Sequence, residues 1–596
     1  MKVLVIDPGA HAASGALWAF YGATQLLEML GVAYDTVSEA DASGGPPAIC
    51  LDPARSALGL NVWPAEHLPA SHDPADDFCV VQHQVEPASD PLGLLRGCPA
   101  SLPLFGPTSC GVEHSEVEAA GVIRRLTDGQ PVAALVYLRQ LQDDRLLLRL
   151  GGPVFETVGL YLSRYSWPAR PEMELHRFVH QIDDLWDEVL RQRWGHRPVV
   201  SDYAVLLANL LAWCFATHDL PLVTAWPHPF REGQIRRHGM LVSHDVDQVY
   251  ADAEFREPDA DQSTNPSFNF ERWRHLESSL GLKSVFFLMS PDPEREYWCT
   301  PGYTIRDRPV LEAALELAER GWEVSVHQLG YDDADLVASE LRAFEAATGY
   351  RPTGTRSHHL KNLPETLLHK QNAGHLYDST WYAEQTESSF LCGSVFPFYP
   401  LECATRRPLR MVEFPFVIED GIVFGAYGED TARSVSGAVA DGRRALDHIL
   451  RHNGYACFNW HQRTFARMSA YEGSPANWTL ALEKLVRYLQ QSSGAWWCPL
   501  PAELARWWAR RAQVQVEVSP GPRRSGILPD ADIAVTNTGE DDLADLVVAI
   551  HSTSKAPVVA GLAGEGLAYL GSSGCRERWG LPVPAPAGAS VRIGLE

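Results

Sequence analysis

Residues that can bind a metal ion or move a proton stand at the ends of several apolar runs in this chain. A short apolar run predicts a buried strand, and two carboxylates at its exit, such as Asp245 and Asp247, need a partner if they are buried. Polar groups at the carboxyl ends of successive strands are typical of an α/β barrel, whose loops at that end carry the chemistry. The segments are Met240–Asp247, Trp322–His327, Arg351–His359 and Tyr455–His461. Aspartate and three histidines in this arrangement predict a metal hydrolase.

Strand-like and helix-like segments alternate through the part of the chain that carries these residues, from residue 236 to 512. Repeated β/α units of this spacing predict a parallel barrel or open barrel. The expected strands are 239–245, 284–289, 322–327, 354–358, 411–417 and 455–461, and the expected helices are 268–280, 308–320, 335–347, 364–372, 430–451 and 478–491.

Three further regions flank the predicted barrel. Residues 1–105 open with a β-loop-α-β pattern, which predicts a small doubly wound α/β domain, and residues 106–235 predict an α+β accessory region. Residues 513–596 alternate with period two between glycine and proline turns, which predicts a C-terminal β-sandwich. The fold class expected for the whole chain is therefore α/β.

Composition narrows the possible partners. At 596 residues the chain needs several cores, and its formal net charge of −25 argues against nucleic acid or an anionic membrane surface as a partner. Its 11 cysteines contain no C-x-x-C pair, which favours a reducing compartment. The apolar stretch after Met1 is too short for a signal peptide, and no run of about 18 apolar residues predicts membrane insertion. We therefore expect a cytoplasmic protein.

The motifs resemble those of the polysaccharide deacetylase superfamily (carbohydrate esterase family 4). Ser243–Asp247 looks like the first motif of that family, in the variant that separates the aspartate pair by one residue. The remaining motifs follow in the family's order: Glu323–Gln328 resembles the second, Gly354–His358 the third, Tyr377–Thr380 the fourth and Asn459–His461 the fifth. Leu162–Tyr165 and the region before it look like the N-terminal extension of a bacterial subset of the family.

The resemblance implies a deacetylase-type barrel with a divalent metal held by an aspartate and two histidines. The family's second motif places another histidine four residues after the first, but Tyr331 stands there in this chain. We expect Asp247, His327 and His358 to be the ligands, with His358 in place of the missing histidine. Zinc is the first choice for such nitrogen and oxygen ligands, and nickel, cobalt and iron remain open.

The resemblance also implies the groups that transfer protons. Asp245 matches the general base, although an exchange of roles with Asp247 stays open, and His461 matches the general acid. Arg356 matches the arginine that orients the base through a charge-assisted hydrogen bond. Asp378 is expected to orient or tune His461.

Three functions are compatible with the sequence. The first is a metal-dependent hydrolase of an amide carbon–nitrogen bond outside peptides, which removes an acyl group from an N-acylated sugar or related small carbohydrate. The second is a degenerate barrel that binds carbohydrate or a partner, which Tyr331 favours and the retained Asp245 and His461 oppose. The third assigns nucleotide binding to residues 1–105, where no glycine-rich phosphate loop occurs.

Overall fold

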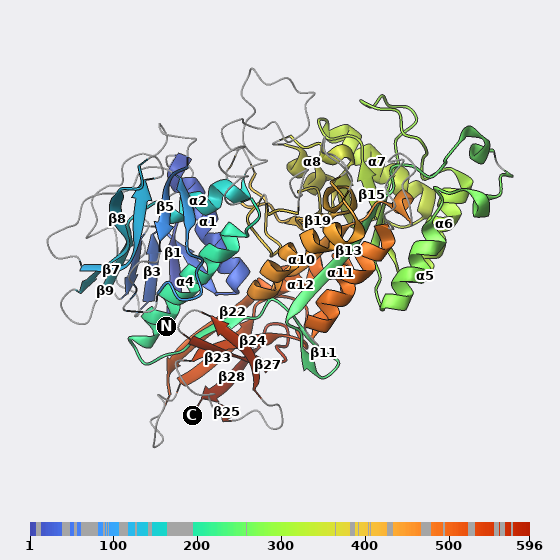
Figure 1. The fold of residues 1–596 in the computed structure, drawn as a ribbon. Helices are drawn as coiled ribbons and strands as arrows, with labels where there is room; N and C mark the ends of the chain where they lie inside the picture. The colour runs from blue at the N-terminus through green and yellow to red at the C-terminus, as the bar shows by residue number, and fades with distance from the viewer. Residues whose placement is uncertain are drawn as a thin grey trace.

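The computed structural model shows a mixed N-terminal sheet with helices, a curled parallel sheet with helices, and two small sheets formed largely by the C-terminal residues (Figure 1). The structure describes residues 1–7, 14–38, 48–52, 57–60, 81–86, 90, 92, 94–105, 117–125, 128–140, 146–163, 195–257, 259–363, 365–381, 388–390, 392–402, 405, 407–425, 433–465, 478–492, 495–521, 531–552, 559–560, 567–573 and 576–595. Residues 164 and 165 of the motif expected in the N-terminal extension lie outside this set.

One nine-stranded sheet, in the order β2-β1-β3-β4-β9-β8-β7-β5-β6, forms the N-terminal part. Its strands are β1 (Lys2–Ile6), β2 (Tyr34–Val37), β3 (Ala48–Asp52), β4 (Ala57–Leu60), β5 (Val81–Glu86), β6 (Leu102–Phe105), β7 (Val117–Arg125), β8 (Pro131–Gln140) and β9 (Leu146–Leu150). Only β1 pairs in parallel, with β2 and β3, and all the other pairs are antiparallel.

The doubly wound topology expected for residues 1–105 is therefore wrong, because strands from both sides of residue 105 alternate in one mixed sheet. The β-loop-α-β start is present, but the later strands return as hairpins. The division into separately folding units at 105, 235 and 512 stays a prediction.

Three described helices accompany this sheet: α1 (Ser14–Leu30), α2 (Val154–Leu162) and α4 (Val199–Ala216). Glycines let α1 and α2 approach closely, since a Cβ at Gly22 would lie 2.0 Å from the Phe155 carbonyl oxygen. Helix α4 has 18 residues with a mean hydropathy of 1.7, so by length and composition it could span a membrane, and 83% of it is buried inside the protein. A central helix of a folded core shows the same composition.

The curled sheet is entirely parallel and contains nine strands, eight in the order β18-β17-β16-β15-β14-β13-β20-β19, with β21 beside β13. Its strands are β13 (His238–Asp245), β14 (Val285–Leu288), β15 (Glu323–Gln328), β16 (Gly354–Ser357), β17 (Tyr377–Asp378), β18 (Val412–Glu413), β19 (Ile418–Glu419), β20 (Tyr455–Asn459) and β21 (Trp496–Trp497). The predicted parallel α/β arrangement is thus confirmed.

A single segment joins the two edges of this sheet. Residues 411–417 were expected to form one strand, but only β18 lies within them, and β19 follows directly at Ile418. Phe414 N donates to the Asp378 carbonyl at 2.9 Å, on the β17 side, whereas Val417 N donates to the Cys457 carbonyl at 3.2 Å, on the β20 side. Phe416 N still donates to the Trp381 carbonyl at 2.9 Å, so the segment changes neighbours between Phe416 and Val417 and curls the sheet back toward its first strand.

The helices of this part of the chain are α5 (Phe270–Leu280), α6 (Arg308–Glu319), α7 (Ala334–Thr348), α8 (Thr366–Ala373), α9 (Asp420–Val423), α10 (Val435–His452), α11 (Trp478–Ser492) and α12 (Pro501–Arg511). Short 3-10 helices lie at Ala253–Arg256, Gln262–Thr264, His358–Leu360 and Gln462–Thr464. Local sequence sets these ends: the Asp333 side chain caps α7, and Gly349 ends it at a φ of 80°.

Two four-stranded antiparallel sheets, β22-β23-β28-β25 and β10-β24-β27-β26, occupy the C-terminal part. Their strands are β10 (Leu222–Ala225), β22 (Val514–Pro520), β23 (Ala531–Asn537), β24 (Val547–Ser552), β25 (Val559–Ala560), β26 (Ala568–Ser573), β27 (Arg576–Pro582) and β28 (Ser590–Leu595), and the hairpin β11 (Phe230–Arg231) and β12 (Gln234–Ile235) follows β10. The burial of β23 alternates, as the period-two pattern predicts. Strand β10 precedes the barrel in sequence, so this part is not made by residues 513–596 alone.

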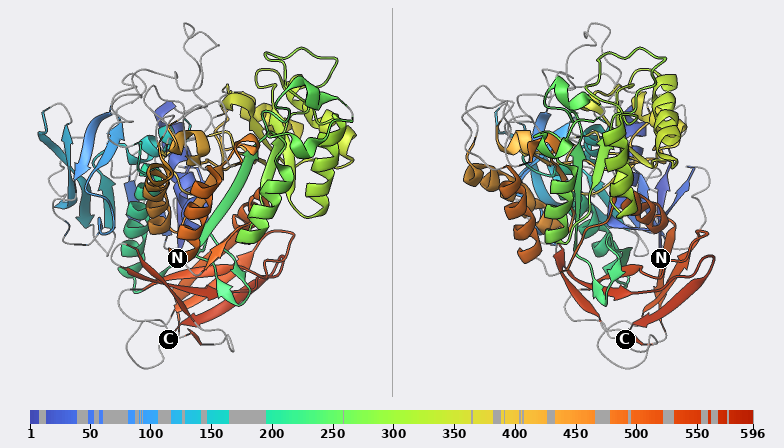
Figure 2. Two further views of the ribbon diagram at one scale, coloured as in Figure 1. Left: turned by 45° about the vertical axis from the view of Figure 1, so that its right-hand side comes forward. Right: turned by 90° about the vertical axis from the view of Figure 1, so that its right-hand side faces the viewer.

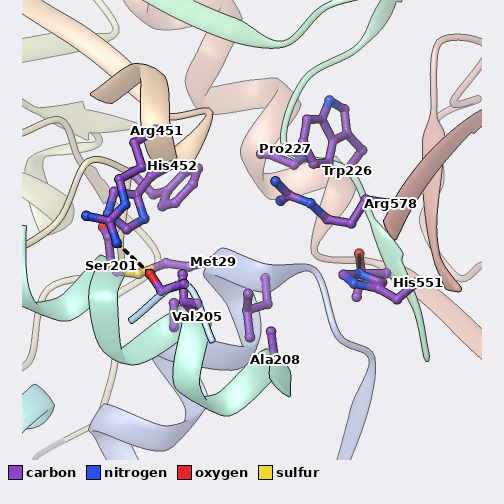
Figure 3. A pocket seen from close by; sticks show the side chains of 15 residues that line it. Met29, Ser201, Val205, Ala208, Trp226, Pro227, Arg451, His452, His551 and Arg578 are labelled. Atoms are coloured by element: carbon purple, nitrogen blue, oxygen red, sulfur yellow. Dashed lines mark hydrogen bonds between the residues drawn. The ribbon is translucent and has the colours of Figure 1, made fainter. Parts of the chain in front are cut away.

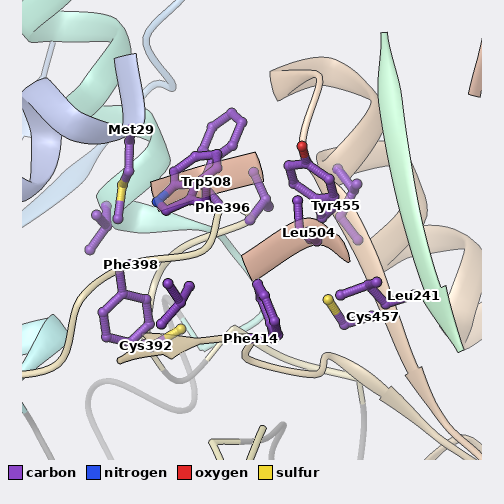
Figure 4. Packing of buried hydrophobic residues seen from close by; sticks show 14 of the residues in the cluster. Met29, Leu241, Cys392, Phe396, Phe398, Phe414, Tyr455, Cys457, Leu504 and Trp508 are labelled. Carbon is purple, nitrogen blue, oxygen red and sulfur yellow. The ribbon is translucent and has the colours of Figure 1, made fainter. Parts of the chain in front are cut away.

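The three parts share one continuous hydrophobic core. Figure 4 shows Met29 of α1 near Phe396 and Trp508, with Tyr455 of β20 beside Leu504. The two turned views show the same arrangement, with the C-terminal sheets beneath both the N-terminal sheet and the barrel (Figure 2). The N-terminal part and the C-terminal sheets therefore both pack against the barrel.

Candidate metal centre

The polar residues predicted from the sequence meet at the carboxyl ends of the parallel strands. Asp245 is the last residue of β13, and Asp247 follows it by two positions. His327 lies near the end of β15, His358 follows β16, and His461 follows β20. Parallel strands end at the same edge of a sheet, and this common edge brings residues more than 200 positions apart into contact.

Asp247, His327 and His358 present three ligand atoms that all lie within 4.8 Å of one another. Asp247 Oδ1 is 3.1 Å from His327 Nε2 and 3.2 Å from His358 Nδ1, and the two imidazole nitrogens are 3.1 Å apart. The Asp247 side chain is 18% exposed, so solvent reaches the centre from one side. The expected substitution of His358 for the histidine missing at Tyr331 agrees with this geometry.

The tautomer of His327 shows why these atoms suit a cation. Its Nδ1 lies 3.1 Å from the Arg356 carbonyl oxygen, which can only accept, so Nδ1 carries the proton. In the neutral ring Nε2 then presents a lone pair to Asp247 and to His358. Three converging lone pairs are satisfied by extra protons on the imidazoles or by a cation between them. A backbone carbonyl that fixes the tautomer is the usual support of a metal-binding histidine.

Charge around Asp247 also favours its ionised form. Burial acts to raise the pKa of this carboxyl, but hydrogen bonds from His327 and His358, together with the positive charge of His461, hold it well below its ordinary value. An ionised carboxylate with two imidazoles is a donor set that zinc and similar divalent ions accept. These residues therefore fit the metal that the motifs imply.

Asp245 lies in a different environment from Asp247. Its Oδ1 accepts from Arg356 Nη1 at 2.8 Å, and its Oδ2 accepts from Asn459 Nδ2 at 3.0 Å. Burial acts to raise its pKa, yet the charges of Arg356, His327 and His461 bring it below its ordinary value. The geometry thus places Asp247 on the histidines and Asp245 on Arg356, as the preferred assignment expects.

Arg356 is a buried positioning group. The rings of Phe287 and Phe416 both lie against its guanidinium, and each ring centroid is 4.6 Å from Arg356 Cζ. Besides Asp245, it donates to the Ser379 carbonyl and hydroxyl oxygens at 2.5 and 2.7 Å. Because all three of its nitrogen atoms donate hydrogen bonds and two aromatic rings contact it, the guanidinium holds Asp245 in one orientation.

His461 pairs with Asp420, a residue that the motifs did not indicate. His461 Nδ1 donates to Asp420 Oδ1 at 2.8 Å, and its Nε2 lies 3.4 Å from Asp247 Oδ2. Burial acts to lower the pKa of His461, but Asp420 outweighs it and raises the pKa to about 10. The other oxygen of Asp420 accepts from the His461 backbone N–H and from Thr464 Oγ1, so this carboxylate orients the imidazole.

Asp378 does not take the predicted place beside His461. Its Oδ1 accepts from Lys370 Nζ at 2.7 Å, and both side chains are fully buried. The reason is that β17 and β20 are separated around the curled sheet, whereas Asp420 starts directly after β19, the neighbour of β20. A carboxylate just beyond the apolar run 411–417 was the available signal for Asp420.

Tyr331 stands where the family's second motif has its other histidine, and it is buried. Its carbonyl accepts from Thr366 Oγ1 at 2.6 Å, and Lys361 Nζ lies 5.3 Å from its ring. His359 lies outside the three-ligand group and has a φ of 52°, an unusual value that belongs to the tight turn after His358. Trp298 stacks on His358 with ring centroids 5.8 Å apart and donates to the Leu329 carbonyl at 2.9 Å, so it helps to hold the His358 ring in place.

A second acidic group, formed by Glu419, Asp420 and His461, also has spacing suited to an ion. Both oxygens of Asp420 already accept hydrogen bonds, including one from the Gly421 N–H at 2.7 Å. The first group is therefore the better metal site of the two.

Comparison with known proteins gives similarity at the level of structure. No family model matches the sequence, and no curated protein matches it. Over about 47% of its length the chain is structurally similar to polysaccharide deacetylases of carbohydrate esterase family 4.

Three of the similar structures come from bacteria. One is a Mycobacterium smegmatis protein described as a polysaccharide deacetylase, and another is a carbohydrate esterase family 4 pseudoenzyme from Bacillus anthracis. The third is a family 4 acetyl xylan esterase from Clostridium thermocellum in complex with a cobalt ion. The first is 18% identical, with 47% of this chain and 93% of that chain covered and a TM-score of 0.34. The second is 11% identical, with 47% and 68% covered and a TM-score of 0.25. The third is 12% identical, with 45% and 91% covered and a TM-score of 0.25.

Proposed function

We propose that this protein is a metal-dependent amide hydrolase that removes an acyl group from an N-acylated sugar or a related small carbohydrate. The observation that carries this proposal is the meeting of Asp247, His327 and His358 around one point, with Asp245 two positions before Asp247 and His461 Nε2 3.4 Å from Asp247 Oδ2. The motif resemblance supplies the reaction class. Zinc is the proposed metal.

Asp247, His327 and His358 would hold the ion, which when bound supplies a Lewis acid for the substrate carbonyl and lowers the pKa of a water molecule. The protein fixes this donor set through the Arg356 carbonyl, which orients His327, and through Trp298, which packs on His358. The ligands therefore need little reorganisation.

Asp245 is the proposed base. Hydrogen bonds from Arg356 and Asn459 keep it ionised and fix the direction of its remaining lone pairs. An ionised carboxylate beside the centre can accept the proton of an attacking water at an Oδ atom. The same two bonds make it a poor fourth protein ligand, because both of its oxygens already accept hydrogen bonds.

His461 is the proposed acid. Asp420 holds the proton on Nδ1 and leaves Nε2 directed at the centre, 3.4 Å from Asp247 Oδ2. The raised pKa keeps the imidazole protonated at neutral pH, and a protonated Nε2 can give its proton to the leaving amine. A cation on Asp247 would oppose this charge and bring the pKa closer to neutrality.

Metal content and acyl release together test the proposed function. Purified protein is expected to contain close to one divalent ion per chain by elemental mass spectrometry, and to release acetate from at least one N-acetyl sugar in a panel of monosaccharides and oligosaccharides. Dialysis against a chelator should abolish release, and added zinc should restore it. A native protein without bound metal would rule out the hydrolase and favour the degenerate barrel, to which the tyrosine at 331 gives some support.

Cellular location is part of the proposal. All seven cysteines among the described residues are free thiols, which supports a reducing compartment such as the cytoplasm. A small sugar or biosynthetic intermediate is then a better substrate than a cell-wall polymer.

A further inference from the structure

A cavity of about 140 Å³ lies where the N-terminal helices, the barrel and the C-terminal sheets meet. Its walls come from the end of α1, from α4, from β10, from the end of α10 and from β24 and β27 (Figure 3). Helix α10 ends before β20 begins, so the cavity lies toward the amino end of β20, whereas His461 follows its carboxyl end. The cavity is therefore distinct from the candidate metal centre.

Basic side chains dominate the polar part of this cavity. Four of the residues that line it are basic, namely Arg451, His452, His551 and Arg578, and none of the described lining residues is an aspartate or glutamate. Figure 3 shows Arg451 and His452 on one side of the cavity and Arg578 and His551 on the other. In a chain with a formal net charge of −25 such a grouping is unexpected.

Neighbouring groups hold these side chains in place. Arg451 donates to the Gly97 carbonyl at 2.5 Å, and His551 Nε2 lies 3.4 Å from the hydroxyl of Thr224. The carboxylate of Asp202 lies 3.1 Å from His452 Nε2, but it also pairs with Arg197 at 3.3 Å. The Arg578 guanidinium lies 5.6 Å from the centre of the Trp226 ring.

Helix geometry explains the position of only two of these four basic residues. Arg451 and His452 form the last turn of α10, where cations are favourable because backbone carbonyls are exposed there. His551 and Arg578 come from strands, where no such effect exists. Burial also lowers the pKa of Arg578 to about 10, which shows that its charge is held at a cost in hydration that a bound anion would reduce.

We propose that this cavity binds the oxyanion group, phosphate or carboxylate, of a small molecule. Guanidinium groups match the geometry of oxyanions, and the volume resembles that of a cavity of about 150 Å³ that holds a benzene-sized molecule. Phe396, Trp226 and the apolar residues of α4 would contact the rest of the ligand. Such a ligand touches the barrel at Arg451 and the C-terminal sheet at Arg578, so it would stabilise their junction.

The test uses the full chain, freed of metal by a chelator that is then dialysed away, so that the metal centre does not bind the probe. The melting temperature is measured against inorganic phosphate and, separately, against acetate, with sodium chloride at equal ionic strength. One of the two oxyanions should raise the melting temperature well above the chloride series, and its identity distinguishes a phosphate from a carboxylate ligand. Equal effects of all three salts would overturn the proposal.

Variants locate the binding site. Arg578→Gln should weaken binding of the active oxyanion by about tenfold or more in calorimetry, since a charged hydrogen-bond donor is lost. Arg592→Gln removes an exposed arginine of β28 outside the cavity and should leave binding unchanged. If Arg578→Gln does not fold, Arg451→Gln, at an exposed position, serves instead. Unchanged binding in the cavity variant, or equal loss in the control, would assign the anion to another place.

Discussion

Two aspartates only two positions apart illustrate how neighbours divide chemical roles between identical side chains. Asp247 faces two imidazoles and solvent, whereas Asp245 is enclosed by Arg356 and Asn459. Both carboxyls have a pKa below the ordinary value. The charge of Asp247 is balanced by histidines, whose role a metal ion can take over, whereas the charge of Asp245 is balanced by the permanent cation Arg356. The first is suited to coordination and the second to proton transfer.

Replacing each aspartate by asparagine separates these roles. Asp245→Asn should lower turnover by about 10²-fold or more but keep most of the metal, because the base is lost and the three ligands remain. Asp247→Asn should lose both metal and activity. Elemental analysis and acetate release on the two purified variants give the answer. Equal metal loss in both variants would contradict the division of roles.

Truncation of the proposed acid gives a second residue-level prediction. His461→Ala should lower kcat by about 10²- to 10⁴-fold while metal content stays that of the native protein. If the metal leaves with the imidazole, His461 is a ligand, and if the rate is unchanged, it has no part in the reaction.

Asp420 should set the pH range in which the acid works. Burial acts to lower the pKa of His461 and Asp420 raises it, so His461 is protonated below its raised pKa and loses its proton above it. Asp420→Asn removes the charge, lowers that pKa, and should move the alkaline limb of the kcat profile to lower pH. The profile is measured on metal-loaded native and variant proteins. An unmoved alkaline limb would show that His461 does not provide the titrating proton.

At the scale of elements, one buried carboxylate ties a helix to three strands of the barrel. Glu277 of α5 lies 2.8 Å from His244 Nε2 of β13, and it accepts from Ser284 and, at the start of β15, from Trp322. His244 Nδ1 in turn donates to the Trp460 carbonyl at 2.7 Å, next to His461. The contact thus joins the first motif to the fifth.

Removing this carboxylate should destabilise the barrel. Glu277→Ala leaves three buried donors without their acceptor and is expected to cost about 3–5 kcal/mol of stability. Glu271→Ala, an exposed position of the same helix whose side chain pairs with His275, should change stability by about 0.5 kcal/mol or less. Scanning calorimetry of both variants measures the effect. Similar melting temperatures would mean that the Glu277 contacts contribute little.

The local pattern of apolar residues predicted those strands and helices whose buried face can be identified from their own residues. Strands such as 239–245 and helices such as 308–320 were expected within a residue or two of β13 and α6, because apolar period and end signals lie in adjacent residues. The three residues of the candidate metal group were located for the same reason, since each lies at or just after the end of its own strand. Asp420 was missed because residues 411–417 divide between two neighbours, a property of barrel curvature that no local pattern records.

At the scale of the whole molecule, the sequence did not predict which distant segments pair with each other in a sheet. Strand β10 pairs with β24, more than 300 positions later, and strands on both sides of residue 105 share one sheet. Each of these strands has the ordinary strand pattern. The strand with which each one pairs depends on how the faces of whole sheets and helices pack. Domain boundaries predicted from composition therefore could not include these pairings.

Arg511, at the end of α12, is the residue that most directly joins the parts of the molecule. Its guanidinium donates to the Glu28 and Met29 carbonyls in the last turn of α1 at 2.8 and 3.1 Å, and to the Ala225 carbonyl of β10 at 2.9 Å. Helix ends leave such carbonyls without partners, and here a buried cation from the barrel part supplies the donors. Gly31 leaves room for this contact, since a Cβ there would lie 2.0 Å from the Ala225 oxygen.

Arg511→Met should therefore loosen the N-terminal part from the barrel. Methionine keeps apolar packing against Trp508 but removes the hydrogen bonds that Arg511 donates to three carbonyls, at a cost of about 3 kcal/mol or more. The expected result is a lower melting temperature with faster amide exchange in the last turn of α1, while the strands around Asp247 keep their protection. Arg506→Met, at an exposed position of the same helix, is the matched control and should leave both unchanged. Loss of protection spread evenly over the barrel would show instead that Arg511 supports the barrel itself and not the junction.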